Sequence, residues 1–126
     1  MSFAKWAYRL AAVYGVIVLA PLLIAEPAIT AQTGSITYPE YYYGFAGAAL
    51  VFQALFALIS TDPARYRRVM LISIAEKVCF PAAVWPLFLA GRTNGPVVAF
   101  ATIDAALAVV FLISWMRTRP VPEAAA

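Results

Sequence analysis

The sequence predicts an all-α integral membrane protein built as a four-helix bundle. Hydrophobic residues make up 64% of the 126 residues and charged residues only 12%, whereas soluble domains are about 25% charged. A helix needs about 20 mostly apolar residues to cross a bilayer. Four segments meet that requirement: roughly 9–28, 41–60, 68–90 and 96–116. They fill nearly the whole chain, so we expect one transmembrane domain over residues 1–126 and no separate soluble domain.

The first segment follows Lys5 and Arg9 and ends near Ala25, an arrangement that secretory signals also show. The apolar run is long for a signal, and Glu26 and Pro27 occupy the positions where cleavage would be expected. We therefore interpret it as a retained helix. A polar loop around residues 32–35 leads to the second segment.

The two later connections carry residues that favour helix starts. Before the third segment, Thr61 or Asp62 can cap the helix while Pro63 takes its first turn, where a missing N–H is harmless. Asn94 and Pro96 repeat this pattern before the fourth segment. Residues 120–126 are expected to form a disordered tail.

The distribution of basic residues predicts the orientation, because cytoplasmic loops retain Lys and Arg. Seven basic residues lie at one side of the predicted spans, and only Arg92 lies at the other. The seven are Lys5, Arg9, Arg65, Arg67, Arg68, Arg117 and Arg119. We expect both termini on the cytoplasmic side of the cell (inner) membrane.

The residue types restrict the chemistry that the chain can perform. It contains one cysteine, Cys79, and no histidine. A cysteine pair, histidine-ligated haem or metal, and histidine general-base catalysis are therefore excluded. We expect no cofactor, no metal and no nucleic-acid partner, and we expect Cys79 to pack as a small apolar residue.

The informative residues are the polar ones inside the predicted spans, because an intramembrane charge costs at least about 2.5 to 3.5 kcal/mol. Counting about 1.5 Å per residue from the cytoplasmic ends places four of them at depths of about 10 to 18 Å: Gln53, Glu76, Lys77 and Asp104. Neighbouring residues diverge by about 100° around a helix, so Lys77 is expected to turn away from Glu76. We predict a Lys77–Asp104 ion pair and a Glu76–Gln53 hydrogen bond.

This polar layer has two interpretations. One is structural, because polar contacts between membrane helices contribute about 0.6 to 2 kcal/mol each. The other is a ligand or proton site, favoured by Pro81 and Pro86, which are expected to interrupt the third helix and leave carbonyl groups without donors. Carboxyl groups in an apolar setting also suit proton transfer or a cationic ligand.

Residues near the opposite end of the spans can contribute to the same site. Glu26 can close it from the outer side, or it can be an ordinary interfacial carboxylate. Residues 38–45 are rich in tyrosine, which predicts an aromatic belt at the interface. In the alternative, Tyr41 or Tyr43 turns inward as a lid, with its hydroxyl on Glu26 or Asp104. Small residues around Gly44 and Gly47 favour tight helix packing or a homodimer seam.

The order of these features resembles short bacterial four-transmembrane-helix proteins of unassigned function. The shared features are the stretch at residues 38–45, the Asp-Pro-Ala-Arg-Tyr-Arg turn at 62–67, the Glu76-Lys77 pair and Asp104. The layout is also distantly similar to the EXPERA group, which includes the emopamil-binding protein and the sigma-2 receptor, through Glu26 and the stretch ending at Gln53. That group uses a histidine, which this chain lacks. The resemblance therefore implies binding of an apolar ligand rather than isomerase chemistry.

The leading hypothesis is a non-catalytic membrane protein that binds a hydrophobic or amphipathic small molecule. The predicted binding residues are Gln53, Glu76, Lys77 and Asp104, with Glu26 and Tyr41 at the outer end. One alternative is acid/base isomerisation of a lipid or sterol-like substrate by Glu76 and Asp104. A second is an accessory subunit of a membrane complex, and a third is ion or proton transport. Membrane lipids are the expected surroundings in every case.

Overall fold

The computed structural model describes residues 2–122 of the chain. Within them the chain is helical in six segments, in the order α1 (Ser2–Leu19), the short 3-10 helix η1 (Ala20–Leu23), α2 (Glu26–Thr33), α3 (Pro39–Thr61), α4 (Arg67–Leu89) and α5 (Gly95–Arg117). Residues 119–122 have no helix or strand, and the rest of the predicted disordered tail lies outside the described residues.

Four helical stretches are long and apolar enough to cross a membrane: Phe3–Leu23, Pro39–Thr61, Arg67–Leu89 and Gly95–Arg117. The prediction of an all-α chain with four helices long and apolar enough to cross a membrane is confirmed. The predicted first helix over 9–28 is wrong at both ends, since α1 begins at Ser2 and ends at Leu19. Pro21 and Pro27 each lie in the first turn of a new helix, η1 and α2, because a proline N atom cannot donate to the preceding turn.

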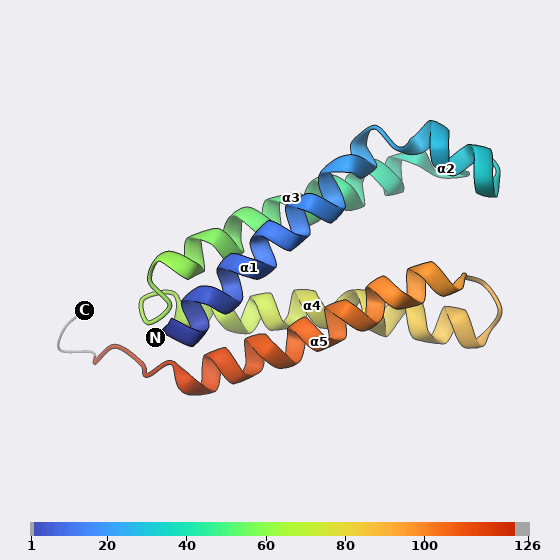
Figure 1. Ribbon diagram of the computed structural model, residues 1–126. Helices are drawn as coiled ribbons and strands as arrows, with labels where there is room; N and C mark the ends of the chain where they lie inside the picture. The colour runs from blue at the N-terminus through green and yellow to red at the C-terminus, as the bar shows by residue number, and fades with distance from the viewer. Residues whose placement is uncertain (1, 123–126) are drawn as a thin grey trace.

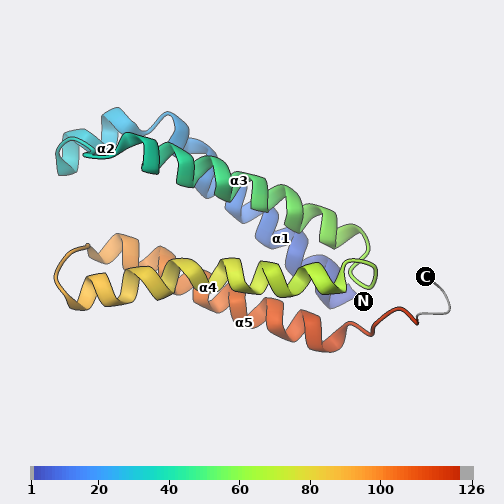
Figure 2. The ribbon, with the colours of Figure 1, turned by 180° about the vertical axis from the view of Figure 1, so that it is seen from behind.

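The helices pair as two hairpins rather than forming one closely packed bundle (Figure 1). One hairpin consists of α1 and α3, and the other of α4 and α5. The hairpins meet at the end that holds the described ends of the chain and the α3–α4 turn, and they diverge toward the opposite end. Figure 2 shows the same V shape from behind. The two hairpins therefore lie closer together at one end, the closed end of the V, than at the other, its open end.

An aromatic core joins the hairpins at the closed end of the V. Tyr8 of α1 stacks on Phe111 of α5, with ring centroids 4.1 Å apart, and meets Phe56 of α3 edge to face at 6.0 Å. The Tyr8 and Ser73 hydroxyl oxygens are 2.6 Å apart. Because the Ser73 hydroxyl donates to the Met70 carbonyl, Tyr8 is the donor in this pair. These contacts link all four long helices.

Helix α4 departs from the sequence-based expectations in two ways. It continues through Pro81 and Pro86, so the predicted interruption is wrong, and its packing along α5 supports the continuous helix. It also begins at Arg67 without a side-chain cap, because Asp62 instead accepts a hydrogen bond from the Arg65 N–H in the preceding turn. The Asn94 cap of α5 is confirmed, since its side chain accepts from the Val97 N–H at 3.1 Å.

Close helix packing at a small residue occurs at a different glycine from those predicted. A Cβ atom added at Gly44 or Gly47 would meet nothing within 4 Å, so these glycines do not mediate close approach within the chain. Close approach occurs at Gly15 of α1, where an added Cβ would collide with the Gln53 side chain of α3. Gly15 therefore lets α1 and α3 pack tightly beside the opening.

Candidate functional site

The opening between the hairpins contains a cleft of about 480 Å³. Small-molecule sites generally have volumes of about 300 to 1,000 Å³, so the cleft is large enough for a ligand. All four long helices and η1 contribute to its lining: Tyr14, Gly15, Val18, Leu19, Leu22, Phe45, Ala48, Ala49, Phe52, Gln53, Glu76, Lys77, Cys79, Phe80, Ala83, Phe100 and Asp104.

Polar groups lie deep in the cleft, where the hairpins converge. The Lys77 Nζ atom donates to Asp104 Oδ1 at 3.3 Å, which confirms the predicted ion pair between α4 and α5. The Lys77 side chain is only 6% exposed, and the Asp104 side chain is 20% exposed. The ammonium also lies 5.2 Å from the centre of the Phe56 ring. Lys77 thus contacts both the polar part of the cleft and the aromatic core at the closed end of the V.

The predicted hydrogen bond between Glu76 and Gln53 is wrong. The Gln53 Nε2 atom donates instead to the Ala49 carbonyl of its own helix at 2.8 Å. Glu76 Oε2 lies 3.7 Å from Lys77 Nζ, close enough for electrostatic attraction but too long for a hydrogen bond. Glu76 and Lys77 both line the cleft despite their divergence around the helix, because long side chains can bend toward a common polar region.

Two buried acceptor atoms remain unused in this polar region. Gln53 is 1% exposed, and neither its Oε1 atom nor Glu76 Oε2 has a hydrogen-bond partner among the described residues. Buried polar atoms are normally satisfied. Gln53 Oε1 lies against Gly15 of α1, and Glu76 Oε2 has the Lys77 ammonium 3.7 Å away.

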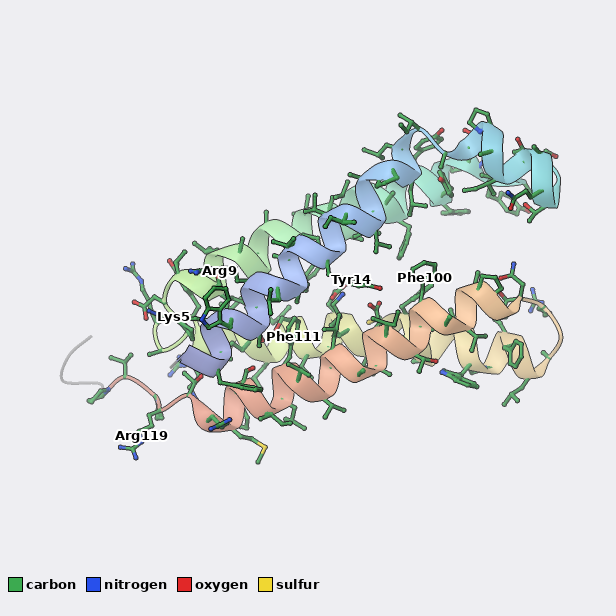
Figure 3. The ribbon with its side chains drawn as sticks, in the orientation of Figure 1. Lys5, Arg9, Tyr14, Phe100, Phe111 and Arg119 are labelled. Atoms are coloured by element: carbon green, nitrogen blue, oxygen red, sulfur yellow. The ribbon has the colours of Figure 1, made fainter. Side chains whose placement is uncertain are left out.

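The walls toward the open end of the cleft are apolar. Phe45 of α3 and Phe80 of α4 face each other with ring centroids 5.5 Å apart, and Phe45 and Phe100 remain 47% and 46% exposed. Figure 3 shows Phe100 and Tyr14 extending from α5 and α1 into the space between the hairpins. The cleft is therefore amphipathic, with polar groups at its closed end and phenyl rings at its opening.

The structure brings together four of the residues predicted for ligand binding, since Gln53, Glu76, Lys77 and Asp104 line one cleft. Glu26 and Tyr41 are not among the residues that line it. Glu26 begins α2 beyond the helix break and accepts a hydrogen bond from the Tyr43 hydroxyl at 2.5 Å. Tyr41 is 72% exposed. The Tyr43–Glu26 contact that formed part of the lid alternative is present, but it lies outside the cleft lining.

Sequence reasoning missed the contribution of α1 and the apolar walls. Tyr14 and Gly15 line the cleft, but a tyrosine and a glycine in an apolar run give no signal of a site. The expectation that Cys79 is packed inside the protein is also wrong, because this residue is exposed and lines the cleft. Phe45 belongs to the tyrosine-rich stretch, whose composition predicted only an interfacial belt.

The donor set limits the chemistry of the cleft. Across residues 2–122, no group of three or more Cys, Asp or Glu side chains is placed to hold a metal ion. The polar or ionisable groups present are one ammonium, two carboxyl groups, one amide, one phenol and one thiol. Such a set can bind a polar head group or exchange a proton with it.

No family model, curated protein or solved structure matches this chain. The resemblance to the EXPERA layout stays a prediction.

Proposed function

We propose that this chain is a ligand-binding membrane protein that holds a hydrophobic or amphipathic small molecule between its two hairpins. The observation that carries the proposal is the amphipathic cleft, with Lys77 and two carboxyl groups at its closed end and phenyl rings at its opening. An intramembrane polar group is expensive unless it is paired or functional. Here the polar groups face a space large enough to admit a ligand.

The basic residues favour one orientation of the chain in the membrane. The basic residues Lys5, Arg9 and Arg119 lie at the closed end of the V (Figure 3), and the positive-inside rule favours placing that end in the cytoplasm. We infer that the protein lies in the cell (inner) membrane with both termini cytoplasmic. The cleft then opens toward the outer leaflet, where an amphipathic molecule can enter sideways from the lipid.

Acid/base isomerisation by Glu76 and Asp104 receives less support from the same geometry. It requires two carboxyl groups that are both free to exchange protons with a substrate. The Lys77 ammonium hydrogen-bonds to Asp104 and lies near Glu76, so Asp104 has a fixed partner. Binding needs no such freedom and is the simpler use of these residues.

An accessory-subunit role is the second candidate. Gly44 is exposed and a Cβ atom at Gly44 or Gly47 would meet open space, so this side of α3 can receive a helix from another protein or from a second copy. Crosslinking through cysteines placed at Gly44 would test this candidate. Absence of any crosslinked product in native membranes would remove its support.

The binding proposal is tested by filling the cleft without disturbing the core. Ala48 of α3 lines the cleft and is exposed within it, whereas Ala54 of the same helix is exposed and lies outside the cleft lining. We expect Ala48→Phe to lose bound small molecules that native mass spectrometry detects on the wild-type protein. The matched variant Ala54→Phe should retain them, because its new ring points away from the site.

Two results would overturn the proposal. The first is a wild-type protein that carries no small molecule and acquires none when it is incubated with a total lipid extract. The second is an Ala48→Phe variant that folds and binds as well as the wild type. Thermal unfolding of both alanine variants, measured in the same detergent, separates a blocked cleft from a misfolded protein.

A further inference from the structure

The closed end of the V carries positive charge that the described part of the chain does not neutralise. The start of α1, the α3–α4 turn and the end of α5 meet there (Figure 1) and bring seven basic residues to this end. Asp62 is the only acidic residue of that end among residues 2–122. The salt bridges recorded for the same residues both involve Lys77, inside the cleft. An anion from outside the protein would therefore complement this end.

The side chain of Arg67, at the start of α4, is held in a fixed position. Its Nε atom donates to the Thr118 carbonyl at 2.7 Å, and its guanidinium lies 4.3 Å from the centre of the Trp115 ring. Thr118 is only 2% exposed, and both its hydroxyl and its N–H donate to the Ser114 carbonyl. A guanidinium has five N–H donors, and the donors on the terminal nitrogen atoms of Arg67 have no partner among the described residues. Arg67 thus presents pre-positioned, unused donors.

Two further arginines lie beside the acceptor of the Arg67 side chain. Arg117 and Arg119 flank Thr118 in the chain, and both are exposed. The Arg117 guanidinium lies 4.9 Å from the centre of the Phe3 ring of α1. Arg119 extends from the segment that follows α5 (Figure 3). Residues from α4 and from the end of α5 therefore place three arginines on one part of the surface.

The depth of these arginines in the molecule indicates which anion they meet. Arg67 begins one candidate membrane span, and Arg117 ends another, so both lie where the apolar surface stops. Tryptophan, the residue type that carries the Arg67 guanidinium, is enriched at the head-group level of membranes. The planar guanidinium fork matches the oxygen atoms of a phosphate group. A lipid phosphate is the anion that occupies this depth.

We propose that Arg67, Arg117 and Arg119 form a binding site for the phosphate group of an anionic phospholipid in the leaflet at the closed end of the V. The terminal N–H groups of Arg67 donate to the phosphate oxygen atoms, and the other two arginines supply further positive charge. In the orientation proposed above, this is the cytoplasmic leaflet. The site is separate from the cleft, so the inference does not rest on the proposed binding function.

Three probes distinguish the head group, its charge and its attachment to a lipid. Phosphatidylglycerol and phosphatidylcholine with identical acyl chains both contain a phosphate, but only the first has a net negative charge. Glycerol 3-phosphate supplies the phosphate without acyl chains. Each probe is titrated against the purified protein in detergent micelles, and binding is measured by native mass spectrometry. We expect phosphatidylglycerol to bind at least about tenfold more tightly than either of the other probes.

Variants of equal charge locate the site. Arg67→Gln and Arg119→Gln should each weaken phosphatidylglycerol binding about fivefold, since a basic residue near a membrane surface contributes about that factor. Arg9→Gln removes the same charge from α1, where the Arg9 guanidinium lies over the Trp6 ring. Arg92→Gln removes it from the α4–α5 connection at the opposite end. Both control variants should keep most of the affinity.

Three results would overturn the inference. The first is equal affinity for the two lipids, and the second is binding of glycerol 3-phosphate as tight as that of phosphatidylglycerol. The third is an equal loss in all four variants, because net charge alone would then explain binding. Thermal unfolding identifies a variant that folds poorly. If Arg67→Gln does so through the lost bond to Thr118, the comparison of Arg119→Gln with Arg9→Gln still decides. The Ala48→Phe test of the cleft succeeds or fails independently of these results.

Discussion

Replacing Lys77 by methionine tests whether the Lys77 ammonium stabilises the two neighbouring carboxyl groups of the cleft. The change keeps a long side chain but removes the only ammonium between two carboxyl groups. Breaking a buried ion pair by removing one partner generally costs about 3 to 5 kcal/mol. The carboxyl groups are each 20% exposed to the cleft, so we expect the low end, about 3 kcal/mol of lost stability.

A double-mutant cycle with Asp104→Asn measures the coupling free energy between Lys77 and Asp104, separately from the cost of changing each buried side chain alone. The single Asp104→Asn variant leaves Lys77 near Glu76 at 3.7 Å, and we expect it to cost only about 1 kcal/mol. In the Lys77→Met/Asp104→Asn double variant one charge of each sign is removed. We expect a total loss of about 2 kcal/mol, which corresponds to a coupling of about 2 kcal/mol between the two residues.

Reversible unfolding in mixed micelles of a mild detergent and dodecyl sulfate, followed by far-UV circular dichroism, measures these free energies. Lys5→Met makes the same side-chain change in the first turns of α1, where Lys5 has no salt bridge among the described residues, and should alter stability by less than about 0.5 kcal/mol. The reasoning is refuted if Lys77→Met costs less than about 1 kcal/mol or if the Lys77 and Asp104 effects are additive.

Three further predictions concern the rest of the molecule. Gly15→Ala gains about 1 kcal/mol of helix propensity but forces the Gln53 amide from its place, so we expect nearly unchanged stability and lost ligand occupancy, measured by unfolding and native mass spectrometry. Retained occupancy would contradict this role of Gly15. Tyr8→Phe removes a buried hydrogen bond to Ser73 and should lower the free energy of unfolding by about 1 to 2 kcal/mol without changing ligand occupancy. Unchanged stability would contradict the contribution of this hydrogen bond to the aromatic core at the closed end of the V. Green fluorescent protein fused to the C-terminus should fluoresce and alkaline phosphatase fused there should be inactive, because we place that end in the cytoplasm, and the reverse pattern would invert the orientation.

Much of the architecture could be predicted from local properties of the chain. Helix lengths and hydropathy are local, so the four apolar stretches and the Asn94 cap follow directly from the sequence. The grouping of Lys77 with Asp104 also follows, because a charge in an apolar segment needs a partner at a similar depth. The prediction of one regular first helix was wrong because Pro21 and Pro27 start new helical segments. The two prolines are a local signal, but the prediction followed the hydropathy pattern instead.

The sequence by itself determined the four stretches long and apolar enough to cross a membrane and the pairing of Lys77 with Asp104. Only the tertiary structure decided that the helices form two hairpins that diverge, that Gln53 turns to its own helix rather than to Glu76, and that α1 contributes Tyr14 and Gly15 to the cleft. Lipid is as apolar as the helix surfaces, so pairing and rotation depend on close packing and polar contacts between helices. Those contacts join residues far apart in the chain, as Gly15 does with Gln53, and no local pattern encodes them.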